Sequence, residues 1–298
     1  MARPSAAAYA ACPMPLTSLL LVLVLAAACL PSTAEAQERS TQPRYSFGVI
    51  PQRSPTLTAQ YWNPILQYVS DKSGIALELS LARSAAEHSD GIRQGRFAFL
   101  YSNHNFVPEN ATARYRVIAR PRAAAIRGEI VVLAASPLKD VPELQGREIA
   151  FPSNVAFVAY QVPMDALEKL GIRVKPVFAG NQEGAMGQLK SGRVEAAAVN
   201  SQLMRDFAER EVIRYRVLWR SEEYLNIPIS AHPSVPGRHV DAVRRALQAM
   251  DADPQGARVL EASATLVKQS PPYGFLSATD KEYESHRRFY AKSGASPR

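Results

Sequence analysis

The sequence predicts an α/β protein of two similar lobes. From residue 45 onward, short apolar runs typical of strands alternate with longer segments whose apolar side chains recur at helical spacing. A helix end followed by glycine, arginine and a strand occurs twice, at residues 92–99 and 189–196. With 47% hydrophobic and 21% charged residues among 298, the chain is too apolar for a disordered protein and long enough to bury a large core.

The first half predicts strands and helices in strict alternation. The expected elements are strands at residues 45–50, 75–81 and 97–101, and helices at residues 57–72 and 85–94. The first helix is expected to end at Ser73-Gly74, because glycine readily adopts the left-handed conformation that closes a helix. This alternation is typical of a parallel sheet covered by helices.

The second half repeats this order. The expected elements are strands at residues 147–151, 174–179 and 194–199, and helices at residues 155–170 and 182–190. Extended apolar stretches at residues 128–135 and 217–230 bracket this half, as expected of a chain that crosses to a second lobe and returns. Helical patterns at residues 237–250, 254–263 and 278–291 would complete the first lobe. We therefore assign residues 37–132 and 219–298 to the first lobe and residues 133–218 to the second.

Residues 1–36 predict a signal peptide cleaved after Ala36, which would place the mature protein in the periplasm. The segment has a positively charged start, an apolar run at residues 16–29, and Ala34-Glu35-Ala36 as a small-x-small cleavage site. Two alternatives stay open. The apolar run could remain as a membrane anchor, or the protein could be a lipoprotein attached through Cys29.

Charge and motif content exclude several classes of function. The formal net charge is +8, but the basic residues are spread along the chain without a Lys/Arg run that has interleaved aromatic residues, so we expect no nucleic-acid partner. The five histidines show no metal-ligand spacing, and no GxSxG, P-loop or GxGxxG motif occurs. Both cysteines, Cys12 and Cys29, lie in the expected signal peptide. We therefore expect no enzyme activity, no metal and no cofactor.

Asparagine follows the end of four predicted strands, at Asn103, Asn154, Asn181 and Asn200, and three of these have a neighbouring serine. Ligands of open α/β sheets bind at the carboxyl ends of strands, where helix N-termini present unpaired N–H groups. These amides and hydroxyls would form a neutral cage for a small oxyanion or polar solute. Asparagine and serine are also preferred helix N-caps, so the same residues can have a purely structural role, and both roles can hold at once.

A series of short segments occurs in a specific order between residues 45 and 249. It comprises residues 47–55, 61–66, 95–101, 130–140, 144–151, 162–163, 171–172, 178–180, 192–200 and 216–221. In order and spacing these segments resemble the periplasmic solute-binding proteins of phosphate, phosphite and phosphonate ABC transporters, the phosphonate-binding family.

The resemblance implies a two-lobed periplasmic binding protein of type 2, a clamshell with a ligand cleft between its lobes. Such a protein closes on a small-molecule ligand and delivers it to an ABC permease in the inner membrane, without a reaction. We expect a monomer. One alternative is a sensory receptor that presents its ligand to a membrane histidine kinase. Another is an enzyme on the same fold, for which the sequence shows no acid/base pair.

The family's ligand-binding pattern is altered in this sequence. A Ser-Thr-Ser hydroxyl cluster of the family falls here on Ala156, Phe157 and Val158, whose side chains donate no hydrogen bond. The family's histidine falls on Gln182, an acidic residue on Gln202, and an aspartate near Ile227. A phosphonate buried without donors would be destabilised by desolvation, so we expect the ligand to differ from simple phosphonates.

Tyr101 matches an aromatic residue that the family uses near its ligand, and Asn103 and Asn200 are retained beside it. Arg83-Ser84 lies where the family has a ligand-contacting tyrosine, so Arg83 is either a new anion anchor or a surface arginine. The complete expected set of ligand-binding residues is Arg83, Ser84, Tyr101, Ser102, Asn103, Asn154, Phe157, Asn181, Gln182 and Asn200.

Overall fold

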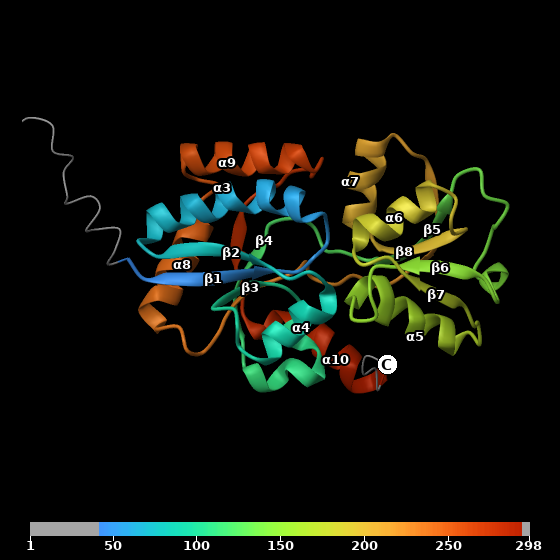
Figure 1. The fold of residues 1–298 in the computed structure, drawn as a ribbon, viewed down its shortest axis with the longest axis horizontal. Coiled ribbons are helices and arrows are strands. Elements are labelled where there is room, and N and C mark those ends of the chain that lie inside the picture. The colour runs from blue at the N-terminus through green and yellow to red at the C-terminus, as the bar shows by residue number, and fades with distance from the viewer. Residues whose placement is uncertain (1–41, 294–298) are drawn as a thin grey trace, which may run out of the picture. The chain divides into compact units, whose positions relative to one another are not determined.

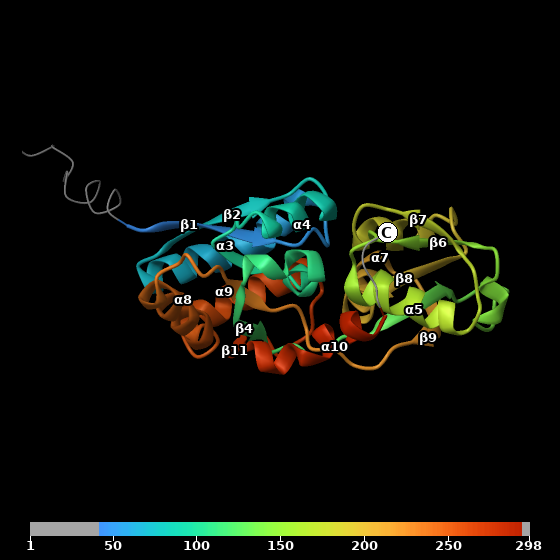
Figure 2. The same ribbon diagram turned by 90° about the horizontal axis from the view of Figure 1, so that it is seen from below.

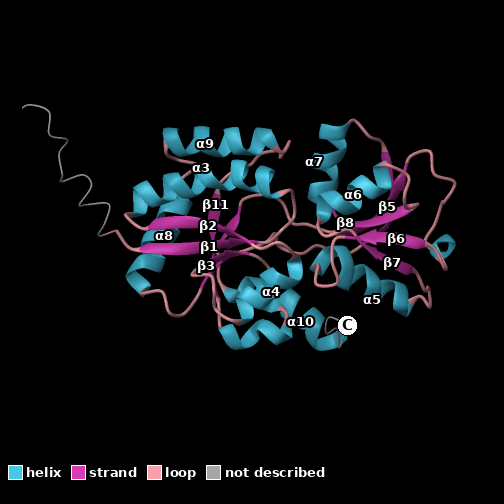
Figure 3. Cartoon of the chain, in the orientation of Figure 1, coloured by secondary structure: helices cyan, strands magenta, loops and turns pink. Residues whose placement is uncertain are grey.

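The computed structural model describes residues 42–293, which form two sheets with helices packed on them (Figures 1 and 3). The expected signal peptide lies outside the described residues. Within residues 42–293, no helix has the length and apolar content needed to cross a bilayer.

The first lobe contains a six-stranded sheet in the order β11-β4-β10-β3-β1-β2. Its strands are β1 (Arg44–Val49), β2 (Ala76–Leu81), β3 (Phe99–Tyr101), β4 (Arg116–Pro121), β10 (Ile229–Ala231) and β11 (Phe275–Ser277). Its helices are α3 (Pro55–Ser73), α4 (Ala85–Arg93), α8 (Gly237–Ala249), α9 (Pro254–Leu266) and α10 (Glu284–Ser293). Short 3₁₀ helices η2 (His104–Phe106), η3 (Pro108–Ala113) and η6 (Asp280–Tyr283) complete this lobe.

The second lobe contains a five-stranded sheet in the order β7-β6-β8-β5-β9. Its strands are β5 (Gly128–Leu133), β6 (Glu148–Phe151), β7 (Lys175–Phe178), β8 (Ala196–Asn200) and β9 (Tyr215–Arg220). Its helices are α5 (Val162–Lys169), α6 (Gln182–Lys190) and α7 (Ser201–Glu211), with the 3₁₀ helix η4 (Pro142–Leu144) and the π-helical turn η5 (Phe157–Gln161).

The two halves share one plan, as the repeated sequence pattern predicts. In the first lobe, β1 pairs in parallel with both β2 and β3, and in the second, β6 pairs in parallel with both β7 and β8. Each lobe is therefore built around a β-α-β-α-β unit whose first strand lies between the other two. This topology brings the carboxyl ends of the three parallel strands to one edge of each sheet.

Local sequence explains why α3 forms where it does. Ser54 is its N-cap and accepts a hydrogen bond from the Leu57 N–H at 3.3 Å, and Pro55 follows at the first position, where no N–H is needed. Gly74 ends the helix in the left-handed conformation. The buried side chains include Trp62, Ile65, Leu66 and Val69, which pack with α8 and α9 on one face of the first sheet.

The boundaries expected at residues 132 and 218 differ from the observed sheet membership. Both fall inside strands, β5 and β9, that pair with each other in the second sheet. The chain crosses between the lobes at residues 122–127 and 221–228, and Ile126 and Tyr224 of these segments exchange two backbone hydrogen bonds of 2.8 Å. An extended apolar run does not reveal which sheet it joins, because its pairing partners are distant in sequence.

The helix expected at residues 155–170 is also interrupted. Residues 157–161 form a π turn, in which the Gln161 N–H donates to the Ala156 carbonyl at 3.0 Å, and the α-helix begins only at Val162. Pro163 accounts for this break, because proline lacks an N–H and its ring excludes a preceding turn of α-helix.

Helix α10 packs where the two lobes meet (Figures 1 and 2). Its His286 ring stacks on Phe157 of the second lobe, with ring centroids 4.5 Å apart. Tyr224 of the second crossing segment meets the same Phe157 ring edge-on at 4.8 Å. The C-terminal helix thus contacts the start of the π turn, which also lines the site described next.

Candidate ligand-binding site

The strand exits of both lobes meet around two adjoining chambers. The first, here called the helix-end chamber, has about 430 Å³ of space free of protein atoms, part of it open to solvent. The second, here called the aromatic chamber, has about 630 Å³ of such space, also partly open to solvent. Gln52 and Asn200 line both.

The helix-end chamber is lined by the starts of helices and by apolar side chains. Its polar lining residues are Gln52, Asn103, His104, Ser153, Gln182 and Asn200. Among the residues that the structure describes, no carboxylate, lysine or arginine lines this chamber. A ligand group placed here would therefore be held by hydrogen bonds rather than by an ion pair.

Two amides of the helix-end chamber have their orientation set by the backbone. The Asn200 Oδ1 atom caps α7 by accepting from the N–H groups of Gln202 at 2.9 Å and Leu203 at 3.3 Å. The Gln182 Oε1 atom accepts from the Asn200 N–H at 3.1 Å. Because these oxygens are occupied, each residue has its NH₂ group left as the available donor. The chamber thus offers a small number of neutral donors to a ligand acceptor.

The first-lobe side of the helix-end chamber has buried polar atoms without partners. The Oδ1 atom of Asn103 and both ring nitrogens of His104 make no hydrogen bond within the described residues. Asn103 is 5% exposed and His104 is 1% exposed. Burial lowers the pKa of His104 to about 4, so the ring is neutral at pH 7 and has one donor and one acceptor. Buried groups of this kind usually have a partner, and a ligand would supply one.

The second-lobe wall of the helix-end chamber is apolar where the sequence predicts it. Ala156, Phe157 and Val158 all line the chamber, and all three are buried. Their side chains contribute shape and exclude water, but they donate no hydrogen bond. The hydroxyl cluster of the phosphonate-binding pattern is thus replaced at this position by an apolar surface.

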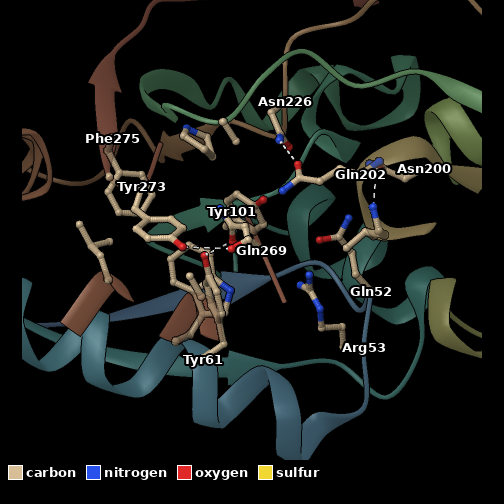
Figure 4. A pocket seen from close by; sticks show the side chains of 17 residues that line it. Gln52, Arg53, Tyr61, Tyr101, Asn200, Gln202, Asn226, Gln269, Tyr273 and Phe275 are labelled. Carbon is tan, nitrogen blue, oxygen red and sulfur yellow. Dashed lines mark hydrogen bonds between the residues drawn. The ribbon is translucent and has the colours of Figure 1, made fainter. Parts of the chain in front are cut away.

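The aromatic chamber has a wall of aromatic rings in tilted and edge-to-face contact (Figure 4). Its aromatic lining residues are Tyr61, Trp62, Tyr101, Tyr273 and Phe275. The rings of Trp62 and Tyr101 lie 4.7 Å apart, and those of Tyr61 and Trp62 lie 5.5 Å apart. Burial raises the pKa of Tyr61 to about 12, so its hydroxyl stays protonated and donates to the Gln269 Oε1 atom at 2.9 Å. The Tyr101 pKa is raised as well, chiefly by burial.

Arg53 is the charged residue that lines the aromatic chamber in the described part of the chain. Its guanidinium lies 3.8 Å from an Asp206 carboxylate oxygen of the second lobe and 5.9 Å from the centre of the Tyr61 ring. Burial raises the pKa of Asp206 to about 7, although the nearby arginines act in the opposite direction. Asp206 is therefore a weak counter-ion near neutral pH.

The remaining polar lining of the aromatic chamber is neutral. The Asn226 Nδ2 atom donates to the Gln202 Oε1 atom at 2.7 Å across the chamber wall, as Figure 4 shows. Gln202 occupies the position at which the family pattern has an acidic residue, and Asn226 precedes the position expected for an aspartate. An uncharged amide pair thus lies where the family pattern has carboxylates.

Five of the ten sequence-predicted residues line these chambers: Tyr101, Asn103, Phe157, Gln182 and Asn200. Asn181 caps α6 by accepting from the Gly184 N–H at 2.8 Å, and Ser84 caps α4 by accepting from the Glu87 N–H at 3.1 Å. Ser102 is fully buried and accepts from the His104 N–H at 3.1 Å, while the Asn154 carbonyl accepts from Gln161 Nε2. These four lie beside the chambers without lining them.

Arg83 lies on the surface. Its side chain is 94% exposed, lines neither chamber, and its Nε atom lies 3.6 Å from Glu87 one turn along α4. Of the two alternatives for Arg83, the structure therefore agrees with the surface arginine, and Arg83 does not anchor an anion at either chamber.

Several lining residues were missed by sequence reasoning. Gln52 and Arg53 follow β1 directly, so a search of every strand exit, rather than of exits with asparagine, would have found them. Gln269 and Tyr273 come from the segment between α9 and β11, far along the chain. No local signal distinguishes them.

The structure provides no cluster for a metal ion within residues 42–293, where groups of three or more His, Cys, Asp or Glu side chains with suitable geometry are absent. The lining of the two chambers consists of hydrogen-bond donors, aromatic rings, apolar side chains and one arginine.

Comparison with known proteins identifies the family. The family model for the phosphonate ABC transporter periplasmic substrate-binding protein matches residues 47–283. The chain belongs to this family. It captures a solute for an ABC transporter, and the family binds small ligands and works with an ABC permease rather than catalysing a reaction. The family is periplasmic, and the sensor-kinase alternative is not favoured.

Solved structures support the same fold. A binding protein component of an ABC phosphonate transporter from Pseudomonas aeruginosa is 16% identical, with a TM-score of 0.74 over 85% of this chain and 87% of that chain. PhnD1 from Prochlorococcus marinus, solved in complex with methylphosphonate, is 14% identical, with a TM-score of 0.71 over 85% and 99% of the two chains. A Xanthomonas citri protein bound to chloride ion is 15% identical, with a TM-score of 0.65 over 84% and 97%. A search of curated protein sequences found no significant match.

These comparisons confirm the family and the type 2 clamshell fold expected from the sequence. At these identities, the solved structures show the fold and not the ligand.

Proposed function

We propose that this protein captures a small polar or anionic solute in the two chambers and that simple phosphonates are poor ligands. The observation that supports this most directly is the lining of the helix-end chamber. It combines the free NH₂ groups of Gln182 and Asn200 with the apolar wall at residues 156–158. Such a site has donors for an uncharged or weakly charged acceptor, but few for the three oxygens of a phosphonate dianion.

Capture would occur by hinge closure at the crossing segments 122–127 and 221–228, since these are the covalent connections between the described lobes. The loop after β1 contacts the second lobe, where the Glu183 N–H donates to the Gln52 carbonyl at 3.3 Å. Opening would break this contact and admit the solute. Closing would remove the solute from water and strengthen its hydrogen bonds.

In the cell, we expect the protein to act as a periplasmic monomer after cleavage at Ala36, and to present its closed form to a permease. Amino-terminal sequencing of the exported protein tests the cleavage, and an amino terminus at Gln37 is the expected result.

A thermal-shift panel tests the proposed ligand range. The exported protein, unfolded and refolded to remove carried-over ligand, would be tested against phosphate, phosphite, methylphosphonate, sulfonates, carboxylates and neutral polar solutes. A ligand at about a thousand times its Kd stabilises by about 4 kcal/mol, or about 8 to 16 °C in midpoint for a chain of this size. We expect a shift of this size from at least one solute of the panel that is not a phosphonate. Tight binding of methylphosphonate, measured by calorimetry, would contradict the proposal. A panel in which no solute raises the melting midpoint would contradict it as well.

A further inference from the structure

The Arg53 guanidinium faces the aromatic chamber without a hydrogen-bond acceptor. Its side chain is only 14% exposed, and it makes no hydrogen bond to any other residue in the 42–293 range. A guanidinium has five N–H donors, and those of Arg53 are left to solvent or to a ligand. An acceptor from outside the chain would therefore be stabilised at this position.

The nearby carboxylate does not fill this role. The Asp206 Oδ2 atom lies 3.8 Å from the guanidinium, beyond hydrogen-bonding distance, and it is buried without a hydrogen-bond partner. Arg53 and Asp206 thus lie near each other, yet neither satisfies the other. A ligand oxyanion could approach the same guanidinium at bonding distance and with bidentate geometry.

The rest of the aromatic chamber favours an organic body attached to that oxyanion. Tyr61, Tyr101 and Tyr273 are half-buried and line the chamber, and the Trp62 ring contacts those of Tyr61 and Tyr101. No carboxylate lines the chamber in the described part of the chain, and Gln202 and Asn226 form a neutral pair. A cationic ligand group would find no counter-charge in this lining.

We propose that the aromatic chamber binds an organic anion, with its carboxylate or similar oxyanion on Arg53 and its planar or apolar body against the rings of Tyr61 and Tyr101. This inference rests on the proposed function and narrows its ligand class. Gln52 lines both chambers, so polar substituents of the ligand would reach the donors of the helix-end chamber.

Calorimetry with matched probes tests separately whether the negative charge of the ligand and its aromatic ring contribute to affinity. Benzoate, phenylacetate and 3-phenylpropionate would be compared with benzamide and phenylacetamide, with phenethylamine, and with acetate and methylphosphonate. We expect at least one ring-bearing carboxylate to bind about tenfold or more tightly than its amide and than acetate, because a charge-assisted bond and the ring contact each add to affinity. Phenethylamine should not bind.

Three variants assign the effect to Arg53. Arg53→Gln should weaken the carboxylate about tenfold or more and abolish the preference for carboxylate over amide. Asp206→Asn should strengthen carboxylate binding, because it removes the competing carboxylate beside the guanidinium. Arg83→Gln is the matched control, since Arg83 lies outside both chambers, and it should bind as the parent protein does.

The outcomes are distinguishable. Equal binding of carboxylate and amide, tight binding of phenethylamine, or a charge preference that survives in Arg53→Gln overturns the inference. Binding only of ring-free solutes overturns it as well, but leaves the proposed function intact. If no probe in either panel binds, both fail. A loss of preference in Arg53→Gln with an unchanged melting midpoint supports the inference and excludes a folding defect.

Discussion

At the scale of single residues, one side chain has a structural role and leaves a donor for the proposed ligand. Asn200 caps α7 with its oxygen, so its NH₂ group is the part left for a ligand. Gln182 is arranged similarly: its Oε1 atom accepts from the Asn200 N–H, and its NH₂ group is left for a ligand. An asparagine at a strand exit can therefore cap a helix and also bind a ligand, because its carbonyl oxygen accepts hydrogen bonds while its NH₂ group donates them.

Asn200→Asp separates these two roles. Aspartate is a good N-cap and its charge favours a helix N-terminus, so the thermal midpoint should change little. The substitution replaces the chamber's NH₂ donor with a negatively charged oxygen, so the affinity for the tightest oxyanion of the panel should fall about tenfold or more. Calorimetry and thermal melting measure the two effects.

Asn181→Asp is the control for this experiment. Asn181 also caps a second-lobe helix through its side-chain oxygen, but it does not line either chamber. Its affinity should stay close to that of the parent protein. If both variants lose binding equally, the effect is a general one of added negative charge and the role assigned to Asn200 is wrong.

At the scale of elements, the apolar wall of the helix-end chamber depends on a close backbone contact. A Cβ atom at Gly128, the first residue of β5, would lie 2.1 Å from the Val158 carbonyl oxygen of the π turn. Glycine is required here by lack of space rather than by its backbone conformation. Because residue 128 has no side chain, β5 and the π turn can pack this closely. This packing places residues 156–158 along the chamber.

Gly128→Ala should destabilise the protein by about 1 to 3 kcal/mol or more, because the backbone oxygen of Val158 cannot move away as a flexible side chain could. Gly187→Ala is the matched control, since Gly187 lies within α6 with nothing within 4 Å of an added Cβ. That change should be neutral or stabilise by about 0.5 to 1 kcal/mol. Urea unfolding measures both, and equal effects would contradict the close-contact explanation.

At the scale of the whole molecule, the loop after β1 connects the lobes by polar contacts. Glu183 of α6 accepts from the Ser54 N–H at 3.3 Å and from Arg210 at 2.6 Å, and Arg53 lies near Asp206 of α7. Asp206 is surrounded by Arg53, Arg205, Arg210 and Glu209, yet burial dominates and raises its pKa to about 7. This raised pKa makes the stability of the molecule depend on pH.

The raised pKa of Asp206 determines whether the stability of the folded protein rises or falls with pH. The folded state binds a proton at this site up to about pH 7, whereas an unfolded aspartate loses it near its ordinary pKa of 3.8. The stabilisation from protonated Asp206 is therefore complete below pH 3.8 and is lost as pH rises through 7. Asp206→Asn should gain stability relative to the parent as pH rises from 5 to 8, and urea midpoints of the two proteins measure this difference.

The comparison of the two proteins cancels the contribution of the buried histidines. Burial lowers the pKa of His104 to about 4 and of His286 to about 3, so both oppose folding at acid pH in each protein equally. A difference between Asp206→Asn and the parent that does not vary with pH would show that Asp206 is ionised throughout.

The site was predicted from the sequence only in part, for identifiable reasons. The strand-exit rule found Asn103, Gln182 and Asn200, because β-α-β units bring exits together wherever the fold is right. It missed Arg53, which has no special signature beyond its place after a strand. The resemblance left Arg83 open as an anion anchor or a surface arginine, because a position carried over by resemblance does not reveal which way a side chain points.

The sequence alone was sufficient for the order of elements, the repeated plan of the halves and the family, since periodicity, caps and motif order are local properties of the chain. It was also sufficient for the apolar segment at residues 156–158. The membership of β5 and β9 in the second sheet, and the meeting of Arg53, Gln202 and Gln269 at one chamber, depended on the tertiary structure. These features arise from strand pairing and from two chain crossings, which join residues far apart in sequence and leave no local pattern.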